Sequence, residues 1–217
     1  MSFCLAEFAD FCHIPEPESF VGKCEKLRLF LEKANSHINL TRLTDRNDFD
    51  LKHAADSLII FHFFPELLTE RLKIADIGCG AGFPSLILAL AAPQLEITAI
   101  DSTGKKINFV TQAAAHLGLS NLYTVHGRAV ELNCLENFRR KFDIITARAV
   151  APSPKIYGET KNFPVSGGKY IFYKTPAQAA EEIPELAKLK NMSWHTSEIF
   201  ELPENSGSRC FVIGTSR

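Results

Sequence analysis

The chain has 217 residues, of which 46% are hydrophobic and 23% charged, and its formal net charge is −1. A chain of this size can form one substantial core with a small extension. No apolar run reaches the roughly 18 residues that span a bilayer. The first residues include acids, whereas a signal peptide begins with bases. Six scattered cysteines without a CxxC pair argue against a zinc site and a disulfide framework, so we expect a cytoplasmic protein that binds no metal and no membrane.

The first apolar periodicity along the chain is helical. Apolar residues recur at Phe20, Cys24, Leu27, Leu31 and Ala34. This spacing predicts an amphipathic helix, whose apolar face is more often part of the core than a partner site. We assign residues 1–72 to an N-terminal helical extension and residues 73–217 to the domain that follows.

Residues 73–84 read KIADIGCGAGFP and hold the strongest functional pattern of the chain. A short apolar run that contains Asp76 and leads into three alternating glycines predicts a buried parallel strand and a tight turn. Glycine lets backbone N–H groups approach a bulky ligand without a clash from Cβ. Tight strand-to-helix turns also need such residues for structural reasons alone, so both interpretations stay open at this point. The apolar stretch from Pro84 predicts the next helix.

The next predicted strand favours a nucleotide-cofactor site. The sequence EITAID at 96–101 ends in Asp101, nineteen residues after Gly82, a spacing that suits a carboxylate bound to ribose hydroxyls. The glycine pattern is GxGxG followed by Phe83, whereas the dinucleotide pattern GxGxxG needs a small residue there. Preceded by Asp76, the loop resembles the first motif of S-adenosylmethionine-dependent methyltransferases. Their cofactor is cationic at sulfur and carries no phosphate that an acid would repel.

Strand and helix patterns alternate after residue 72. Candidate strands cover 73–78, 96–101, 121–126, 141–147, 168–174, 192–201 and 208–214. The clearest helix covers 103–118, with apolar residues at i, i+3, i+7 and i+10 and with Gly118 as its stop. Repeated units of this kind predict a parallel sheet covered on both faces. Because the connection LPENSG is too short for a crossover, the last two strands should form an antiparallel hairpin.

Basic residues concentrate in the middle of the chain. Residues 101–174 carry 11 bases against 5 acids, whereas residues 1–100 carry 9 bases against 14 acids. A basic segment suits a phosphate-bearing substrate, because each neutralised phosphate releases counterions. Candidate contacts are Lys105, Lys106, Arg139, Arg140 and Lys141. Solvated helix faces carry such charges as well, and both interpretations stay open.

Five blocks of sequence in a fixed order resemble the RsmG family, also called glucose-inhibited division protein B. They are INLTRLTDRNDFDLKHAADSL at 38–58, DIGCGAGFP at 76–84, DSTGKKINFV at 101–110, GRAVE at 127–131 and FDIITARAVA at 142–151. The resemblance implies a class I S-adenosylmethionine-dependent methyltransferase, a Rossmann-like α/β fold with a mostly parallel seven-stranded sheet that ends in an antiparallel hairpin. It also implies transfer of a methyl group from S-adenosylmethionine to N7 of a guanine in bacterial 16S ribosomal RNA, free or within a small-subunit particle.

The resemblance assigns site residues as well. Those it places against the cofactor are Gly78, Phe83, Asp101, Ala129, Val130 and Arg148. Asp101 would bind the ribose hydroxyls, and Ala129 and Val130 would lie along the adenine edge through their backbone. Arg148 and Lys174 are the implied catalytic residues, which would hold O6 of the base or nearby phosphates. Guanine N7 has a lone pair and no proton, so positioning in a water-poor pocket takes the place of a general base.

Three segments depart from the family pattern. The loop continues as GFPS rather than GLPG, Val130 stands where the family has an acid, and Thr175 replaces a glycine after Lys174. Other classes of function stay open beside the family's. A small-molecule methyltransferase would share the loop and Asp101 but would not need the basic segment, and a non-catalytic RNA-binding domain would bind no cofactor. An NAD-linked oxidoreductase is disfavoured by Phe83.

Overall fold

The computed structural model describes residues 3–38, 40 and 45–216, so that residues 39 and 41–44 of the first family block lie outside the described residues. Its strands are β1 (Lys73–Ile77), β2 (Glu96–Asp101), β3 (Leu122–His126), β4 (Phe142–Arg148), β5 (Pro164–Lys174), β6 (Met192–Thr196), β7 (Phe200–Glu201) and β8 (Ser208–Ser216). The sheet has the order β3-β2-β1-β4-β5-β8-β6, with β7 paired to β8 outside this path. Strands β1 to β5 pair in parallel, and β8 runs antiparallel to β5, β6 and β7. The predicted mostly parallel sheet with an antiparallel end is therefore confirmed.

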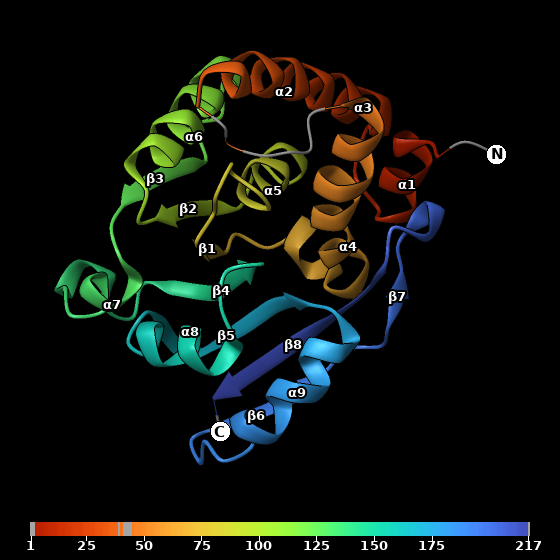
Figure 1. The fold of residues 1–217 in the computed structure, drawn as a ribbon. Coiled ribbons are helices and arrows are strands. Elements are labelled where there is room, and N and C mark those ends of the chain that lie inside the picture. Colours follow the sequence, from red (N-terminus) through yellow and green to blue (C-terminus); the bar gives the residue numbers. More distant parts are fainter. Residues whose placement is uncertain (1–2, 39, 41–44, 217) are drawn as a thin grey trace.

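Helices cover both faces of the sheet (Figure 1). The α-helices are α1 (Leu5–Phe11), α2 (Pro17–Ile38), α3 (Arg46–Asp48), α4 (Asp56–Phe63), α5 (Ser85–Ala91), α6 (Gly104–Leu117), α7 (Ala129–Leu132), α8 (Ser153–Thr160) and α9 (Pro176–Leu186). A π-helical segment, η1 (Phe49–Ala55), leads into α4, and three short 3-10 helices are η2 (Pro65–Leu68), η3 (Glu136–Phe138) and η4 (Pro203–Asn205). The helix predicted over 103–118 is confirmed as α6, which ends at Leu117 and is capped by Gly118, whose φ of 66° lies in the left-handed region.

Alternate residues of each central strand point into two separate cores. On β4, Ile144 lies in one core and Ile145 in the other, and on β5 Ile171 and Phe172 divide in the same way. The first core is shared with α5, α6 and the N-terminal helices, and the second with α7, α8 and α9. Both faces of a strand are thus buried, which explains the nearly continuous apolar runs that predicted these strands.

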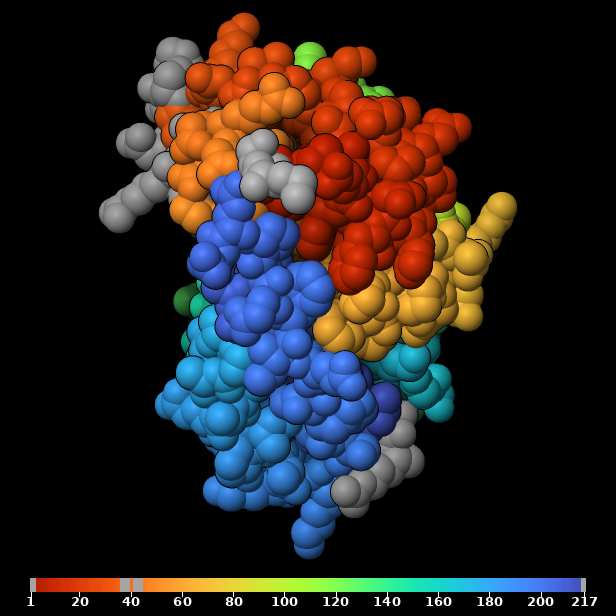
Figure 2. All heavy atoms as spheres, turned by 90° about the vertical axis from the view of Figure 1, so that its right-hand side faces the viewer, coloured from red at the N-terminus to blue at the C-terminus, as the bar shows by residue number. Residues whose placement is uncertain are grey.

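The N-terminal helices pack into the first core together with the sheet. The predicted apolar stripe of α2 is buried from Phe20 to Leu31 and half-buried at Ala34. Figure 2 shows the N-terminal residues against the segment around β7, where the Phe3 N–H donates to Glu204 Oε1 (2.9 Å). A domain boundary between residues 72 and 73 stays a prediction. Among the described residues, no helix combines the length and apolarity needed to cross a bilayer.

The prediction of one strand over 192–201 is wrong. The chain pairs with β8 twice, as β6 and as β7, with an interruption that begins at Ser197. At this position the Ser197 N–H donates to Phe211 O (2.9 Å), and Ser197 Oγ accepts from the Phe211 N–H (2.9 Å). The serine side chain replaces a backbone acceptor in the ladder, so the regular pairing stops where a local side-chain hydrogen bond competes with it.

Candidate active site

The turn between β1 and α5 has the conformation that its glycines predict. The φ angles are 68° at Gly78, 59° at Gly80 and 89° at Gly82, all in the region that favours glycine. At Gly78 a Cβ atom would lie 2.5 Å from Cγ2 of Val150, in the segment that follows β4. Any side chain here would push that segment away, so the close approach of the two turns requires glycine.

The N–H groups of this turn point into the protein, against our expectation that they face a ligand. The N–H groups of Gly78 and Cys79 both donate to Ile100 O, at 2.7 and 3.0 Å, and the Gly80 N–H donates to Asp101 Oδ2 at 3.0 Å. A pyrophosphate site needs such donors turned outward at the start of the helix. These three N–H groups are already used within the protein, so the turn suits a cofactor without phosphate.

Asp76 lies fully buried beneath the turn, at the carboxyl end of β1. Its carboxylate accepts hydrogen bonds from Ser85 Oγ and from Thr146 Oγ1, the latter at 3.2 Å. Burial raises the pKa of Asp76 from 3.8 to about 6, and the two hydroxyl donors act in the opposite direction. The group is ionised at neutral pH and places a negative charge directly below the glycine turn.

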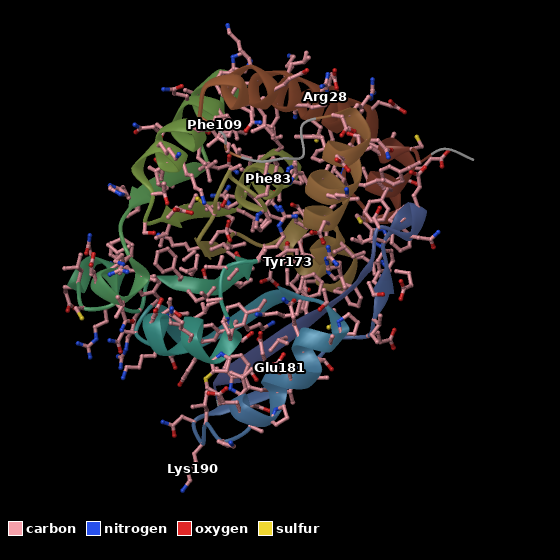
Figure 3. The ribbon with its side chains drawn as sticks, viewed as in Figure 1. Arg28, Phe83, Phe109, Tyr173, Glu181 and Lys190 are labelled. Atoms are coloured by element: carbon pink, nitrogen blue, oxygen red, sulfur yellow. The ribbon has the colours of Figure 1, made fainter. Side chains whose placement is uncertain are left out.

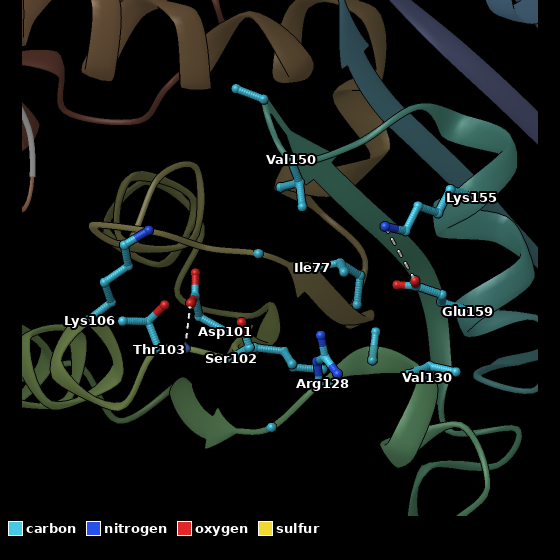
Figure 4. A pocket seen from close by; sticks show the side chains of 15 residues that line it. Ile77, Asp101, Ser102, Thr103, Lys106, Arg128, Val130, Val150, Lys155 and Glu159 are labelled. Atoms are coloured by element: carbon cyan, nitrogen blue, oxygen red, sulfur yellow. Dashed lines mark hydrogen bonds and ion pairs between the residues drawn. The ribbon is translucent and has the colours of Figure 1, made fainter.

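A first cavity of about 510 Å³ opens beside β2, at the carboxyl edge of the sheet (Figure 4). Asp101 stands in its wall, where Oδ1 accepts from the Thr103 N–H (2.8 Å) and Oδ2 accepts from the Gly80 N–H (3.0 Å). A carboxylate has about four lone-pair positions, so each oxygen keeps acceptor capacity for a further donor. Asp101 is thus fixed in place and still able to accept hydrogen bonds from a pair of hydroxyl groups.

Two other predicted cofactor residues line the same cavity. Ala129 and Val130 are the first two residues of α7, ahead of the hydrogen bonds that Glu131 and Leu132 donate to Arg128 O. Their N–H groups precede the intrahelical ladder, and the Val130 side chain is half exposed. The substitution of Val130 for the family's acid leaves this backbone arrangement available.

A second cavity of about 540 Å³ adjoins the first. The two share Gly78, Lys106 and Ala149 as lining residues. The second extends away from β2, over the carboxyl ends of β4 and β5 and under the junction of η1 and α4. The glycine turn therefore stands between two connected spaces at one edge of the sheet, where ligands of open α/β folds bind.

Arg148 lies at the carboxyl end of β4, in the wall of the second cavity. Its Nη1 donates to Asp56 Oδ2 (2.8 Å) and to Lys52 O (2.9 Å), and Nη2 lies 3.4 Å from His53 Nδ1. Asp56 also accepts from Arg209 Nε at 2.6 Å. One buried carboxylate of α4 therefore holds two guanidinium groups, one from β4 and one from β8.

Phe83 is buried against the same cluster. Its ring stacks on that of His53, with centroids 4.1 Å apart and planes at 9°, and the ring of Phe49 meets it edge-on at 5.9 Å. Arg148 Cζ lies 5.8 Å from the Phe83 centroid. Figure 3 shows Phe83 near the centre of the molecule. The phenylalanine that distinguishes this loop from a dinucleotide motif thus joins the glycine turn to the N-terminal helices.

Lys174 ends β5 and is buried. Its Nζ donates to Glu182 Oε1 of α9 (2.8 Å) and to Ala151 O (3.1 Å). Glu182 Oε2 accepts from the N–H and the hydroxyl of Ser153, at 2.9 and 2.5 Å. The lysine and the glutamate together fix the segment between β4 and α8, which contains Val150. Lys174 also lines the second cavity. Its predicted contact with RNA stays a prediction, and the contacts present favour a supporting role in the cavity wall.

The predicted basic contacts separate in space. Lys105 is exposed on the first turn of α6, and Lys106 lines both cavities. The cluster at 139–141 directly precedes β4 and so lies at the amino edge of the sheet. The length of β4, about 20 Å at 3.3 Å per residue, separates it from the cavities. Among these residues only Lys106 lines the candidate site, and Lys105 is its neighbour on α6.

The residues of the site that had no role in the sequence interpretation include Asp56, Glu182 and Arg209. Asp56 lies in the first family block, in the sequence HAADS at 53–57, but the sequence does not show which partners it contacts. Arg209 could have been located from the predicted hairpin, because a strand antiparallel to β5 begins at the edge where β5 ends. Glu182 follows Lys174 by eight residues across a strand-to-helix turn, a spacing that no local pattern connects.

Comparison with known proteins agrees with this geometry. A family model described as rRNA small subunit methyltransferase G matches residues 22–206. Ribosomal RNA small subunit methyltransferase G of Lactobacillus delbrueckii subsp. bulgaricus is 40% identical over 187 residues, which cover 84% of this chain and 77% of that protein. The same enzyme of Streptococcus pyogenes serotype M2 is 41% identical over 189 residues, with the same coverage.

Solved structures support the fold. The crystal structure of a SAM-dependent methyltransferase from Aquifex aeolicus superposes with a TM-score of 0.60 at 16% identity, covering 82% of this chain and 97% of that chain. An rRNA methylase from Streptococcus thermophilus gives a TM-score of 0.53 at 13% identity, covering 71% and 95%. The family match, the sequence identity and the methyltransferase fold lead to one conclusion: the chain belongs to the rRNA small subunit methyltransferase G family.

Proposed function

We propose that this protein transfers a methyl group from S-adenosylmethionine to N7 of a guanine in bacterial 16S ribosomal RNA, in the cytoplasm. The observation that carries the proposal is the pair of cavities that meet at the glycine turn. One contains a fixed carboxylate and two backbone positions of a helix start, and the other is lined by arginines. A nucleoside cofactor and a nucleic-acid acceptor would each find suitable chemistry, with their reacting atoms at the shared wall.

The first cavity suits the nucleoside part of the cofactor. Asp101 would accept hydrogen bonds from the ribose hydroxyls, because each of its oxygens has one donor from the protein and room for another. The backbone of Ala129 and Val130 would line the adenine edge, and Gly78 would allow close passage toward the second cavity. When bound, the cofactor supplies an electrophilic methyl group on a cationic sulfur, which the buried Asp76 below the turn favours electrostatically.

The second cavity would take the acceptor. Guanine N7 has a lone pair and no proton, so the protein needs no general base and contributes alignment and exclusion of water. Arg148, fixed by Asp56 and by Lys52 O, would hold the base or an adjacent phosphate. Lys174 would act through Glu182 and Ala151 O, by keeping the segment that carries Val150 against Gly78. The target guanine must be unpaired or turned out of its stack to enter.

Calorimetry and nucleoside mapping test the proposal together. Titration with S-adenosylmethionine should show one binding site, and ribosomal RNA from cells that lack this protein should lose one 7-methylguanosine, restored by the wild-type gene. Arg148→Ala, verified to be folded, should restore neither the nucleoside nor transfer of label in vitro. Loss of a methyl group from a small molecule instead of RNA would favour the small-molecule reaction. A protein that binds RNA but no cofactor would contradict the proposal.

A further inference from the structure

Arg209 stands at the acceptor side of the site although it comes from the far end of the chain. Strand β8 is antiparallel to β5, with Cys210 opposite Lys174, so Arg209 lies at the edge where β5 ends. It lines the second cavity. Strands β4 and β5 stand between it and β1, where the glycine turn begins. Three strand spacings of about 4.8 Å separate the two strands by roughly 14 Å.

The contacts of Arg209 leave part of its guanidinium available to a ligand. Nε donates to Asp56 Oδ1 (2.6 Å) and Nη1 donates to Ser208 O (3.0 Å). A guanidinium has five N–H donors in a fixed fork, so the Nη groups retain donors after these two bonds. The side chain is 22% exposed, compared with 13% for Arg148 and 7% for Asp56. Arg209 is therefore the outer of the two arginines that Asp56 holds.

The negative charges near this cluster are shared unevenly between its two arginines. Asp56 is the carboxylate that pairs directly with both guanidinium groups. The buried Asp76 acts electrostatically on Arg148 as well, so Arg209, the more exposed of the two arginines, has the less compensated charge. The two lysines beside the cluster have partners of their own, since Lys52 pairs with Asp48 and Lys174 pairs with Glu182. A neutral base edge offers acceptors but cannot compensate this charge. An oxyanion both compensates it and fits the fork of an arginine in two parallel hydrogen bonds.

We propose that Arg209 binds the phosphate beside the guanine that receives the methyl group, and that Asp56 is the positioning residue that orients its guanidinium. The inference rests on the proposed function and names the contact that selects RNA at that site. The carboxylate of the cofactor is a second oxyanion that could occupy the position. The separation of β8 from the glycine turn favours the RNA phosphate, and the experiment separates the two sources.

Arg209→Gln tests the contact, because glutamine keeps a polar side chain and removes the charge. We expect kcat/KM for 16S RNA to fall roughly ten- to hundredfold, the range of a lost bidentate contact at 1–3 kcal/mol. The Kd for S-adenosylmethionine should stay within about twofold of wild type. The slope of log K for RNA against log salt should become less steep by about 0.7, as one phosphate contact to a single strand predicts. Arg209→Lys should keep the salt slope and lose part of kcat/KM.

The matched control is Arg71→Gln, at an exposed arginine just before β1 at the opposite edge of the sheet, which should change none of these values. Circular dichroism and thermal unfolding verify that each variant is folded. An unchanged kcat/KM for RNA in Arg209→Gln overturns the proposal. A parallel loss of cofactor affinity overturns it too, since the anion would then belong to the cofactor. If wild type itself binds no cofactor or methylates no RNA, the proposed function fails independently of these variants.

Asp56→Asn tests the positioning role. Asp56 also holds Arg148, so only part of its effect passes through Arg209. The loss of kcat/KM in Asp56→Asn combined with Arg209→Gln should therefore be smaller than the product of the two single losses by the part that Arg209 transmits. The Asp56→Asn variant alone should raise KM for RNA more than it lowers kcat. If the two losses multiply, Asp56 has no influence on Arg209, and the positioning part of the proposal is contradicted.

Discussion

The buried ion pair between Lys174 and Glu182 permits a quantitative test of what Lys174 does. The two side chains are 7% and 10% exposed, and the pair is 2.8 Å apart. Removal of one partner leaves an uncompensated buried charge, which destabilises a protein by about 3–5 kcal/mol. Such a loss is a large part of the roughly 5–15 kcal/mol by which a native protein is stable. We therefore expect Lys174→Met and Glu182→Gln each to lower the free energy of unfolding by about 3 kcal/mol.

The double variant separates pairing from a direct contact with RNA. Glu182→Gln keeps an oxygen for the Ser153 donors, so the change isolates the ion pair. With both charges removed, the loss should be smaller than the sum of the single losses by at least about 2 kcal/mol. If Lys174 supports the cavity wall, the double variant should also regain RNA methylation relative to Lys174→Met. If Lys174 contacts RNA, activity should stay lost while stability recovers.

Equilibrium unfolding in urea measures these values, and Trp194, the one tryptophan of the chain, serves as the fluorescent probe. It packs against Tyr170 and Phe172 and so reports on the sheet. Glu96→Gln is the matched control, because its pair with Lys73 is exposed on both sides and should contribute less than about 1 kcal/mol. Single losses at Lys174 and Glu182 as small as that of the control, or strictly additive losses, would refute the reasoning.

Three further predictions concern the glycine turn, the acid below it and the lysines beside it. Gly78→Ala should weaken binding of S-adenosylmethionine at least about tenfold in calorimetry, because the added Cβ would displace Val150. The control Gly22→Ala, where a Cβ meets nothing within 4 Å, should leave the affinity unchanged. Equal affinities of the two variants would contradict the close approach of Gly78 and Val150. The pKa of Asp76 is about 6 in the folded protein and 3.8 for an unperturbed aspartate, the value expected in the unfolded chain. The folded state therefore binds this proton more tightly than the unfolded state does. The free energy of unfolding falls as pH rises from 3.8 to 6. At about 1.4 kcal/mol per pKa unit, the gain in unfolding free energy from Asp76→Asn should grow by up to about 3 kcal/mol from pH 4 to pH 7.5, and a gain that does not vary with pH would count against this. Replacing Lys105 and Lys106 by alanine should weaken RNA binding and flatten its salt dependence, whereas replacing Arg139 and Arg140 at the far edge should not; equal slopes in all variants would indicate solvated surface charge only.

Local patterns predicted the parts of the fold that depend on neighbours in sequence. The glycine turn, the strand that ends at Asp101 and the helix that ends at Gly118 follow from backbone sterics and apolar periodicity, which act over a few residues. The break at Ser197 was missed because its cause is a hydrogen bond to Phe211 on the partner strand. The direction of the loop N–H groups was missed for a similar reason, since their acceptors belong to β2.

In the candidate site, too, the sequence predicted what depends on neighbouring residues and missed what depends on tertiary contacts. Asp101 and Arg148 could be placed at one edge because parallel strands end there together. Neither sequence spacing nor composition could reveal that Asp56 connects Arg148 with Arg209, residues 92 and 153 positions away from it. The stacking of His53 on Phe83 was equally hidden, because it depends on how η1 docks over the glycine turn. The sequence motifs therefore located the site, whereas tertiary packing determined which side chains face a ligand.

RNA in which guanine is replaced by 7-deazaguanine, a base without N7, tests directly whether N7 is the atom that receives the methyl group. Two 16S RNAs are transcribed, one with guanine and one with 7-deazaguanine. Each is tested both as naked RNA and assembled into small-subunit particles. Each sample is incubated with this protein and with S-adenosylmethionine labelled in its methyl group. We predict one methyl group per guanine-containing RNA in at least one of the two forms, recovered as 7-methylguanosine, and none in the 7-deazaguanine RNA. Equal labelling of both RNAs, or recovery of the label in another nucleoside, would contradict methylation at N7.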